Sequence, residues 1–448
     1  MAKEQILYKA RLIPVSGISS EREAEVRATS AFLAVLTIVR DLSMELLSPL
    51  GASRAQKATV EAFSEVEMVL AGKKIRPDGL IRVTWGQSTW SALVEVKTRN
   101  NPLDPDQINA YWDLARQDGI DHILTISNEI APSHNIHPTE GLKVRANSKV
   151  AVSHLSWTAI LTTALRIQQH KGVRDVEQAW ILGELIRYLQ HPASGALDFE
   201  DMGPNWTSVR DGARASELTR RTQGVEEISS RWDQLLRFAA LRLASDIGED
   251  VNSVMPRNQR DPSKRTAYLV ESLTARGILT GSLMIPNTAG HLDLIADLRA
   301  RHITASIDVN APGDKGAIGR VSWLVRQLSD SPPELIVESY PKGARTCTSA
   351  TLGAIREDRD AALDGDRREP SRFRLVLRRE MGMGRTTGRK NPGFITSVLD
   401  LIDGFYGDIV QQITPWQPPA PQIKRPPISE EAEDRGELEP SASKWLEP

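Results

Sequence analysis

The chain has 448 residues, of which 40% are hydrophobic and 25% charged, and 56 basic against 58 acidic residues leave a formal net charge of −2. One hydrophobic core rarely serves a chain this long, so we expect two or three domains, and the apolar content excludes disorder throughout. The single cysteine, Cys347, excludes an internal disulfide and a cysteine-rich zinc site. No apolar run reaches the roughly 18 residues of a membrane span, and the first residues lack the features of a secretory signal. The composition therefore predicts a cytoplasmic protein with no membrane partner.

The first third of the chain predicts the element order helix, three strands, helix, strand. Apolar residues recur at helical spacing after a capping serine at position 19 or 20. The turn-forming sequences 72–74 and 86–88 separate three strand-like runs. The predicted elements are a helix at 20–47, strands at 62–70, 76–85 and 89–98, a helix that starts at Asp104-Pro105 and extends to about residue 117, and a strand at 122–127.

The remainder predicts a helical middle region, a second mixed segment and a disordered tail. The predicted elements are helices at 157–169, 176–189, 228–246 and 264–275, strands at 279–285, 291–298 and 303–310, a helix at 318–328 and a strand at 334–339. Prolines and acidic residues dominate the tail, which buries too little apolar area to offset chain entropy. We therefore expect an N-terminal α/β domain over 1–160, a helical region over 161–260, a C-terminal α/β domain over 261–414 and a disordered tail over 415–448.

The strand at 89–98 combines apolar anchoring with a charged pair. Successive side chains of a strand point to opposite faces, so Glu95 and Lys97 share one face while Val94 and Val96 occupy the other. A hairpin at 86–88 can bring Asp78 of the preceding strand beside Glu95. Two neighbouring carboxylates repel each other unless a cation joins them, and their hard oxygens suit Mg²⁺ or Mn²⁺. This pattern predicts a metal site beside a lysine that can stabilise phosphate charge.

The spacing of these residues resembles the PD-(D/E)xK nuclease superfamily. Asp78 follows Pro77, sixteen residues (79–94) come next, and then Glu95-Val96-Lys97. Gln107 and Tyr111 on the following helix are similar to the Q-x-x-x-Y signature of the RecB-like branch and its phage and restriction relatives. The resemblance covers about residues 15 to 160. It implies an α/β fold with a restriction-endonuclease-like αβββαβ core.

The resemblance also implies a role for each site residue. Asp78 and Glu95 would be metal ligands, with the backbone carbonyl of Val96 as another. Lys97 would be the catalytic lysine. Gln107 and Tyr111 would position the substrate or the lysine, although Tyr111 also suits a core aromatic residue. Several branches use a glutamate of the first helix as a further ligand, and Glu25 is the candidate because it shares a face with core-forming residues of that helix.

The function expected from this resemblance is a magnesium-dependent (or manganese-dependent) deoxyribonuclease, acting as an endonuclease in defence against foreign DNA. DNA repair is the other context, and RNA stays open as a substrate. The alternative from another class is a non-catalytic nucleic-acid-binding or assembly protein that keeps the nuclease fold. A homo-oligomer or a partner protein of a defence system also stays open.

Three further patterns lie outside this motif. The stretch 367–390 is rich in arginine, and Arg372, Arg374, Arg378 and Arg379 are candidates for nucleic-acid binding, with a solvated strand and loop as the alternative. Segments 291–295 and 306–310, with the helix and strand after them, repeat the order of residues 78–127, but Asn310 stands where a lysine would be needed. If this order reflects a duplication, the degenerate second copy lacks its catalytic cation and would serve in binding or dimerisation. An unrelated hairpin followed by a helix is the favoured explanation. We expect His134 and His137 to be solvated loop residues rather than metal ligands.

Overall fold

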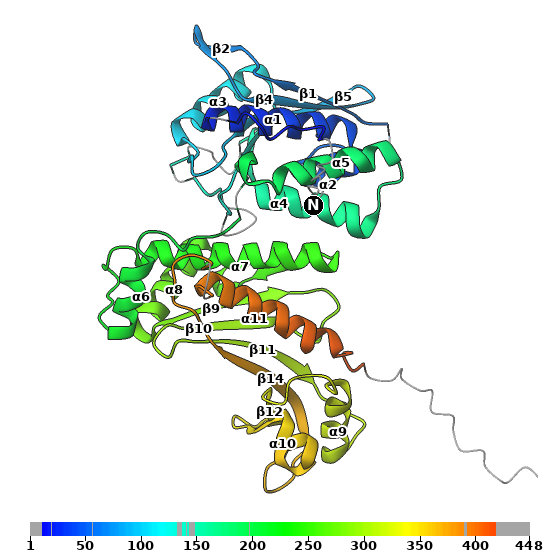
Figure 1. Ribbon diagram of the computed structural model, residues 1–448, viewed down its shortest axis with the longest axis vertical. Helices are drawn as coiled ribbons and strands as arrows, with labels where there is room; N and C mark the ends of the chain where they lie inside the picture. Colours follow the sequence, from blue (N-terminus) through cyan, green and yellow to red (C-terminus); the bar gives the residue numbers. More distant parts are fainter. Residues whose placement is uncertain are drawn as a thin grey trace, which may run out of the picture.

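The computed structural model describes residues 11–18, 20–55, 57–131, 137–139, 141–142, 148–196, 198–388 and 392–417. These residues form two α/β bodies, one around a five-stranded sheet and one around a seven-stranded sheet (Figure 1). The predicted mixed α/β class is confirmed. No helix within these ranges combines the length and apolarity needed to cross a membrane. Residues 418–448, most of the predicted tail, lie outside the described residues.

The N-terminal sheet has the strand order β1-β4-β5-β6-β7. Strands β1, β4 and β5 are antiparallel neighbours, whereas β5, β6 and β7 run parallel. The strands of this half are β1 (Thr59–Ser64), β4 (Gly79–Trp85), β5 (Ser88–Val96), β6 (His122–Ser127) and β7 (Ala151–Ser156), with the small hairpin β2 (Met68–Leu70) and β3 (Lys73–Ile75) outside the sheet. The helices are α1 (Glu21–Ile38), α2 (Arg40–Leu47), α3 (Pro105–Asp118), α4 (Trp157–Arg166) and α5 (Val176–Leu189).

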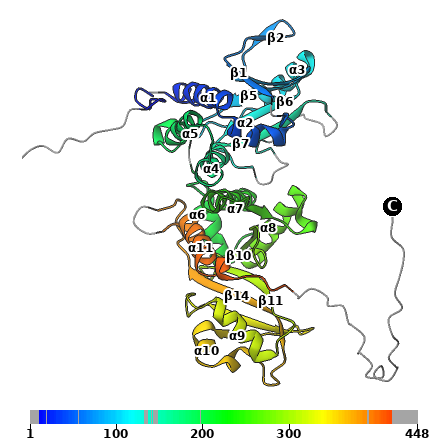
Figure 2. The ribbon, with the colours of Figure 1, turned by 90° about the vertical axis from the view of Figure 1, so that its right-hand side faces the viewer.

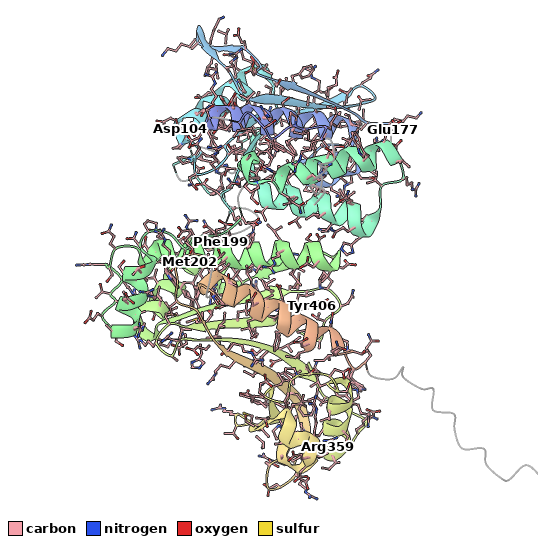
Figure 3. All side chains as sticks on the ribbon, viewed as in Figure 1. Asp104, Glu177, Phe199, Met202, Arg359 and Tyr406 are labelled. Carbon is pink, nitrogen blue, oxygen red and sulfur yellow. The ribbon has the colours of Figure 1, made fainter. Side chains whose placement is uncertain are left out.

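Alternation along the strands divides the apolar residues of this sheet between two hydrophobic layers. Leu93 packs with Ile108 of α3 in one cluster. Val94, the next residue, packs with Phe32 of α1 and Trp157 of α4 in the other. Helix α3 therefore covers one face of the sheet, and α1, α4 and α5 cover the opposite face. Asp104, labelled in Figure 3, caps the first turn of α3 by accepting from the Asp106 amide.

The N-terminal half differs from its sequence-based prediction in three ways. The strand predicted over 62–70 is divided into β1, which pairs with β4, and β2, which pairs with β3 outside the main sheet. The helix predicted over 20–47 is interrupted at Val39, which adopts an extended conformation and is fully buried in the core. The first amide of the second helix, at Arg40, then donates to the Gln178 side chain. Strand β7 was not predicted, because a half-buried edge strand of mixed polarity carries little periodic signal.

The C-terminal half is built on an antiparallel sheet with the order β13-β12-β14-β11-β10-β9-β8. Its strands are β8 (Asn252–Val254), β9 (Ile278–Met284), β10 (Leu292–Asp297), β11 (His302–Asn310), β12 (Ile336–Pro341), β13 (Thr348–Thr351) and β14 (Pro370–Glu380). Its helices are α6 (Trp206–Ala215), α7 (Val225–Ile247), α8 (Pro262–Arg276), α9 (Ala317–Gln327), α10 (Leu352–Glu357) and α11 (Phe394–Asp408). Of these elements, α6, β8, β13, α10 and α11 have no counterpart in the sequence-based prediction.

The helices of the predicted middle region are divided between the two bodies. Buried residues of α4 and α5 belong to the N-terminal core, whereas those of α6 and α7 belong to the C-terminal core, which the chain enters near Phe199 and Met202 (Figure 3). Helices α4 and α7 pack against each other, and Figures 1 and 2 show them side by side at the junction. The described part of 161–260 thus forms no core of its own.

The C-terminal half repeats the order helix, three strands, helix, strand, but the pairing differs from that of the N-terminal half. Strand β14 lies between β11 and β12, whereas β5 and β6 pair directly. Asp293 lies opposite Ser306 and accepts a hydrogen bond from Ser282, and Asp308 is bound by Arg372 and Arg374. The carboxylates of this sheet are therefore not paired in the way that Asp78 and Glu95 are.

Candidate active site

Six side chains converge beyond the carboxyl end of β5. Asp78 immediately precedes β4, Glu95 and Lys97 lie at the end of β5, Gln107 and Tyr111 lie on α3, and Glu25 lies on α1. Hydrogen bonds and ion pairs link five of these side chains to one another, and Asp78 joins the cluster through the Val96 amide. The structure thus brings together all six side chains that the sequence analysis selected for the catalytic and metal-binding roles.

Glu95 is the centre of the cluster. Its side chain is 1% exposed. Oxygen Oε1 accepts a hydrogen bond of 2.7 Å from Lys97 Nζ, and Oε2 accepts one of 2.8 Å from the Tyr111 hydroxyl. Both carboxylate oxygens are therefore held in fixed directions, as a preorganised ligand or acceptor requires.

Asp78 is tied to the same strand through the backbone. Its Oδ2 accepts a hydrogen bond of 2.8 Å from the Val96 amide, so its carboxylate lies next to the residue between Glu95 and Lys97. Burial raises the pKa of Asp78, although the Val96 hydrogen bond opposes the rise. Burial, followed by the charge of Asp78, raises the pKa of Glu95 to about 7. The site therefore holds more negative charge than its surroundings readily accommodate.

Lys97 supplies the positive charge of the cluster. Its Nζ lies 2.7 Å from Glu95 Oε1 and 4.0 Å from Glu25 Oε2. Burial acts to lower the pKa of Lys97, but Glu95, with smaller contributions from Glu25 and Asp78, outweighs burial and raises it. The lysine is therefore an ammonium at neutral pH. The indole of Trp157 donates to the Lys97 carbonyl at 2.9 Å and fixes the end of the strand.

Glu25 is oriented by a residue that the sequence analysis did not select. Its Oε1 accepts a hydrogen bond of 2.7 Å from Asn101 Nδ2. Asn101 comes 76 residues later in the chain, so nothing in the local sequence pattern marks it as a partner of Glu25. The same is true of Trp157, which contacts Lys97 across 60 residues.

Gln107 and Tyr111 act through Glu95 rather than through Lys97. They lie one helical turn apart on α3, and Gln107 Nε2 donates to the Tyr111 oxygen at 2.9 Å. The Tyr111 hydroxyl in turn binds Glu95, and it also lies 3.3 Å from the Arg76 carbonyl. Burial and the charge of Glu95 raise the pKa of Tyr111, which keeps the phenol protonated and able to donate. Tyr111 is thus both a buried core residue and a polar support of the site.

We expect Tyr111→Phe to lower the free energy of unfolding by about 1–3 kcal/mol, because one oxygen of buried Glu95 and the Gln107 amide lose their partner. Thermal and urea unfolding would measure the change. Tyr406→Phe on α11 (Figure 3) is a matched control, since its hydroxyl forms no hydrogen bond within the described residues. Equal losses in the two variants would contradict a specific role of the Tyr111 hydroxyl.

The donor chemistry of the cluster fits a hard divalent cation. Glu25, Asp78 and Glu95 contribute carboxylate oxygens, and burial together with the charge of Asp78 raises the pKa of Glu95. As the described side chains stand, no three His, Cys, Asp or Glu residues are arranged to hold a metal ion, and the Lys97 ammonium offsets part of the negative charge. A ligand role for the Val96 carbonyl stays a prediction.

The four arginines selected as a nucleic-acid surface lie on β14 of the C-terminal sheet, outside this cluster. Arg372 and Arg374 both pair with Asp308, and Arg379 pairs with Glu334. Arg378 is exposed and has no ion pair in the described part of the chain. Much of the positive charge in this group is therefore compensated within the protein, and its contact with nucleic acid stays a prediction.

His137 is not the solvated residue that its loop position suggested; His134 lies outside the described residues. Thr125 Oγ1 lies 2.7 Å from His137 Nε2 and 3.0 Å from His154 Nδ1, and His154 Nε2 lies 2.7 Å from the Glu129 carbonyl. The Thr139 amide donates to His137 Nδ1. When both imidazoles are neutral, one assignment of donors and acceptors satisfies all four of these hydrogen bonds.

This histidine pair predicts acid sensitivity. Burial lowers the pKa of His154 to about 3 and that of His137 to about 4. The charges of His137 and Arg237 also lower the pKa of His154, whereas the hydrogen bond to the Glu129 carbonyl raises it. An unfolded histidine takes up a proton below about pH 6.5, and the folded pair does not until much lower pH. The free energy of unfolding should therefore fall as the pH drops from about 6.5 toward 4.

The expected loss is on the order of 3 kcal/mol for His154 by about pH 4. Urea unfolding at about pH 7 and about pH 4 would measure it. His154→Gln keeps a donor for the Glu129 carbonyl but removes the titrating group, so its stability should change less over this range. If His154→Gln lost as much stability with acid as the wild type, the histidine pair would not be the cause.

No family model, curated protein or solved structure matches this chain. The chemistry of the six clustered side chains is therefore the basis on which a function can be assigned.

Proposed function

We propose that the N-terminal half is a metal-dependent nuclease that hydrolyses phosphodiester bonds in DNA. The observation that carries the proposal is the geometry at Glu95: this buried carboxylate is held between the Lys97 ammonium and the Tyr111 hydroxyl, while Asp78 is fixed beside it by the Val96 amide. A structural ion pair needs one carboxylate and one cation. A second carboxylate, half-buried and with a raised pKa, adds cost without adding stability, and such costs are typical of functional sites.

The topology of the N-terminal sheet supports the proposal. Helix α1 precedes the antiparallel strands β1, β4 and β5, and α3 then leads to β6, which runs parallel to β5. This is the αβββαβ order that the resemblance to the PD-(D/E)xK superfamily implies. The site lies at the carboxyl ends of the parallel strands β5 and β6, where α/β sheets commonly bind their ligands.

In the proposed reaction each residue has a distinct task. Asp78, Glu95 and Glu25 would hold Mg²⁺ or Mn²⁺, and the cation supplies Lewis-acid polarisation of the scissile phosphate. Tyr111 keeps Glu95 in one orientation, and Gln107 keeps Tyr111 in place. The Lys97 ammonium donates to the negative charge that develops on the phosphate, and its half-buried position strengthens that interaction relative to water. Trp157 and the sheet hold the Lys97 backbone, so little reorganisation is needed.

The mode of cleavage with its biological role, the alternative substrate and the rival class belong to the same proposal. Endonuclease action and a role in defence against foreign DNA come from the resemblance alone. RNA would meet the same phosphate chemistry, so it is the alternative substrate. A non-catalytic nucleic-acid-binding or assembly protein is the rival class, and the complete Asp, Glu and Lys set counts against it.

Incubation of the purified protein with four substrates tests the proposal. Linear duplex DNA, closed-circular DNA, single-stranded DNA and RNA would each be combined with Mg²⁺, Mn²⁺ or a chelator. We expect cleavage of a DNA substrate with either metal and none with the chelator. Metal-dependent cleavage of RNA alone would change the substrate class, and binding of nucleic acid without cleavage of any substrate would favour the non-catalytic rival.

A further inference from the structure

Arg99 adopts an unusual backbone conformation two residues after Lys97. Its φ is 55°, in the left-handed region that residues other than glycine rarely adopt. Such a conformation costs about 1–2 kcal/mol for an L-amino acid with a side chain. Glycine would avoid this cost. The Arg99 side chain therefore carries an energetic penalty at a position next to the candidate active site. Strain of this kind is characteristic of functional positions.

Two distant segments clamp the Arg99 backbone in this conformation. The Arg99 amide donates to the Gly195 carbonyl at 2.8 Å. Asn128 Nδ2 donates both to the Arg99 carbonyl at 2.9 Å and to the Gly195 carbonyl at 2.7 Å. The clamp therefore joins the end of β5, the end of β6 and the loop after α5. Its geometry fixes where the Arg99 side chain leaves the backbone.

The stem of Arg99 packs closely against Gly195. Gly195 itself has a φ of +79°, and a Cβ atom placed there would lie 3.2 Å from Arg99 Cγ and 2.9 Å from Thr98 Cβ. The absence of a side chain at Gly195 thus leaves the space that the Arg99 stem occupies. This contact restricts the side chain near its base, and Arg99 as a whole is half-buried.

The Arg99 guanidinium has no ion pair or hydrogen bond within the described residues, although three carboxylates lie in the adjacent site. Those carboxylates have other partners: Lys97 binds Glu95 and lies near Glu25, and the Val96 amide binds Asp78. A guanidinium without a carboxylate partner, on a half-buried residue, is available for an external anion. Its planar, forked donors match phosphate oxygens especially well.

We propose that Arg99 binds the backbone phosphate next to the scissile one and so sets the position of the nucleic-acid strand. This inference rests on the proposed nuclease function and deepens it. Lys97 already occupies the centre of the carboxylate cluster, whereas Arg99 follows it at the carboxyl end of β5 and forms no ion pair with the cluster. Arg99 therefore serves a flanking phosphate, and Asn128 and Gly195 are the positioning residues that hold it.

Equilibrium binding of fluorescent duplex DNA and RNA in a chelator, which prevents cleavage, tests this role. Arg99→Gly should raise the dissociation constant about tenfold, the size of one charge-assisted contact, and reduce the slope of log affinity against log salt by about 1. The same substitution should keep or raise the melting temperature, because glycine accepts the positive φ without strain. With Mg²⁺ present, KM should rise while kcat changes little.

Two further variants separate a phosphate contact from a structural role. Arg99→Lys keeps the charge and should recover part of the affinity. Arg326→Ala on α9 removes an equal charge from an exposed position in the C-terminal half and should leave affinity and slope unchanged. Wild-type affinity and slope in Arg99→Gly, or a lower melting temperature that accounts for its weak binding, would overturn the inference. If the wild type bound no nucleic acid and cleaved none, the proposed function would fail together with this inference. If the wild type cleaved normally and the Arg99 variants kept the wild-type affinity and slope, only this inference would be overturned.

Discussion

Lys97→Ala should lower the cleavage rate at saturating DNA by at least about 100-fold while the protein still folds. The loss follows from removing the ammonium that meets developing charge on the phosphate. Folding should be retained because burial and Asp78 raise the pKa of Glu95 to about 7, and Lys97 opposes a further rise. Without the lysine, Glu95 takes up a proton at neutral pH and leaves no unpaired buried charge.

Single-turnover cleavage and thermal unfolding of the same preparations would measure the two effects. Lys74→Ala is the matched control, since Lys74 is 79% exposed and its ion pair with Glu67 lies on the surface hairpin. Its rate and stability should stay close to those of the wild type. Cleavage by Lys97→Ala at the wild-type rate would remove this lysine from the mechanism.

Asp78→Asn should weaken metal binding as well as cleavage. The new side chain can still accept the Val96 hydrogen bond through its amide oxygen, so the local structure should be retained. It lacks the negative charge, however, and a neutral amide is a poorer ligand for a hard cation. We expect the Mn²⁺ affinity to fall more than about tenfold, which corresponds to about 1.4 kcal/mol. Loss of the neighbouring charge should also lower the pKa of Glu95.

Calorimetric titration with Mn²⁺ would measure the affinity. Asp293→Asn is the control, because Asp293 lies on β10 of the second sheet and accepts a hydrogen bond from Ser282. That substitution removes a carboxylate of the same type from a place where, in the described part of the chain, no second carboxylate is paired with it. Equal Mn²⁺ affinities for wild type and Asp78→Asn would place the metal elsewhere or exclude it.

The predicted site depended on local rules that the fold preserves. The two-residue period of a strand put Glu95 and Lys97 on one face, and the structure joins them by a hydrogen bond. The 3.6-residue period of a helix put Gln107 next to Tyr111, and they are also bonded. Short-range periodicity and the hairpin therefore placed Asp78, Glu95 and Lys97 together, whereas Gln107, Tyr111 and Glu25 were selected on the resemblance to the PD-(D/E)xK superfamily.

Features that depend on distant segments were not predictable in this way. The break at Val39 arises because this residue packs into a core assembled from later elements. Strand β14 inserts between β11 and β12, a pairing that no local pattern specifies. The clamp on Arg99 needs Asn128 and Gly195. In the sequence, Asn128 lies 29 residues from Arg99 and 67 residues from Gly195. The buried His137–Thr125–His154 chain likewise joins a strand, a loop and a neighbouring strand.

The most direct test of the central claim is the conversion of closed-circular plasmid DNA to nicked or linear forms. Wild type and Asp78→Asn would be compared side by side, each in Mg²⁺ and in a chelator. We expect conversion only by the wild type and only with Mg²⁺, because in the proposed site Asp78 and Glu95 would hold the cation beside Lys97. Conversion by Asp78→Asn at the wild-type rate, or undiminished conversion in the chelator, would contradict a metal-dependent site at these residues.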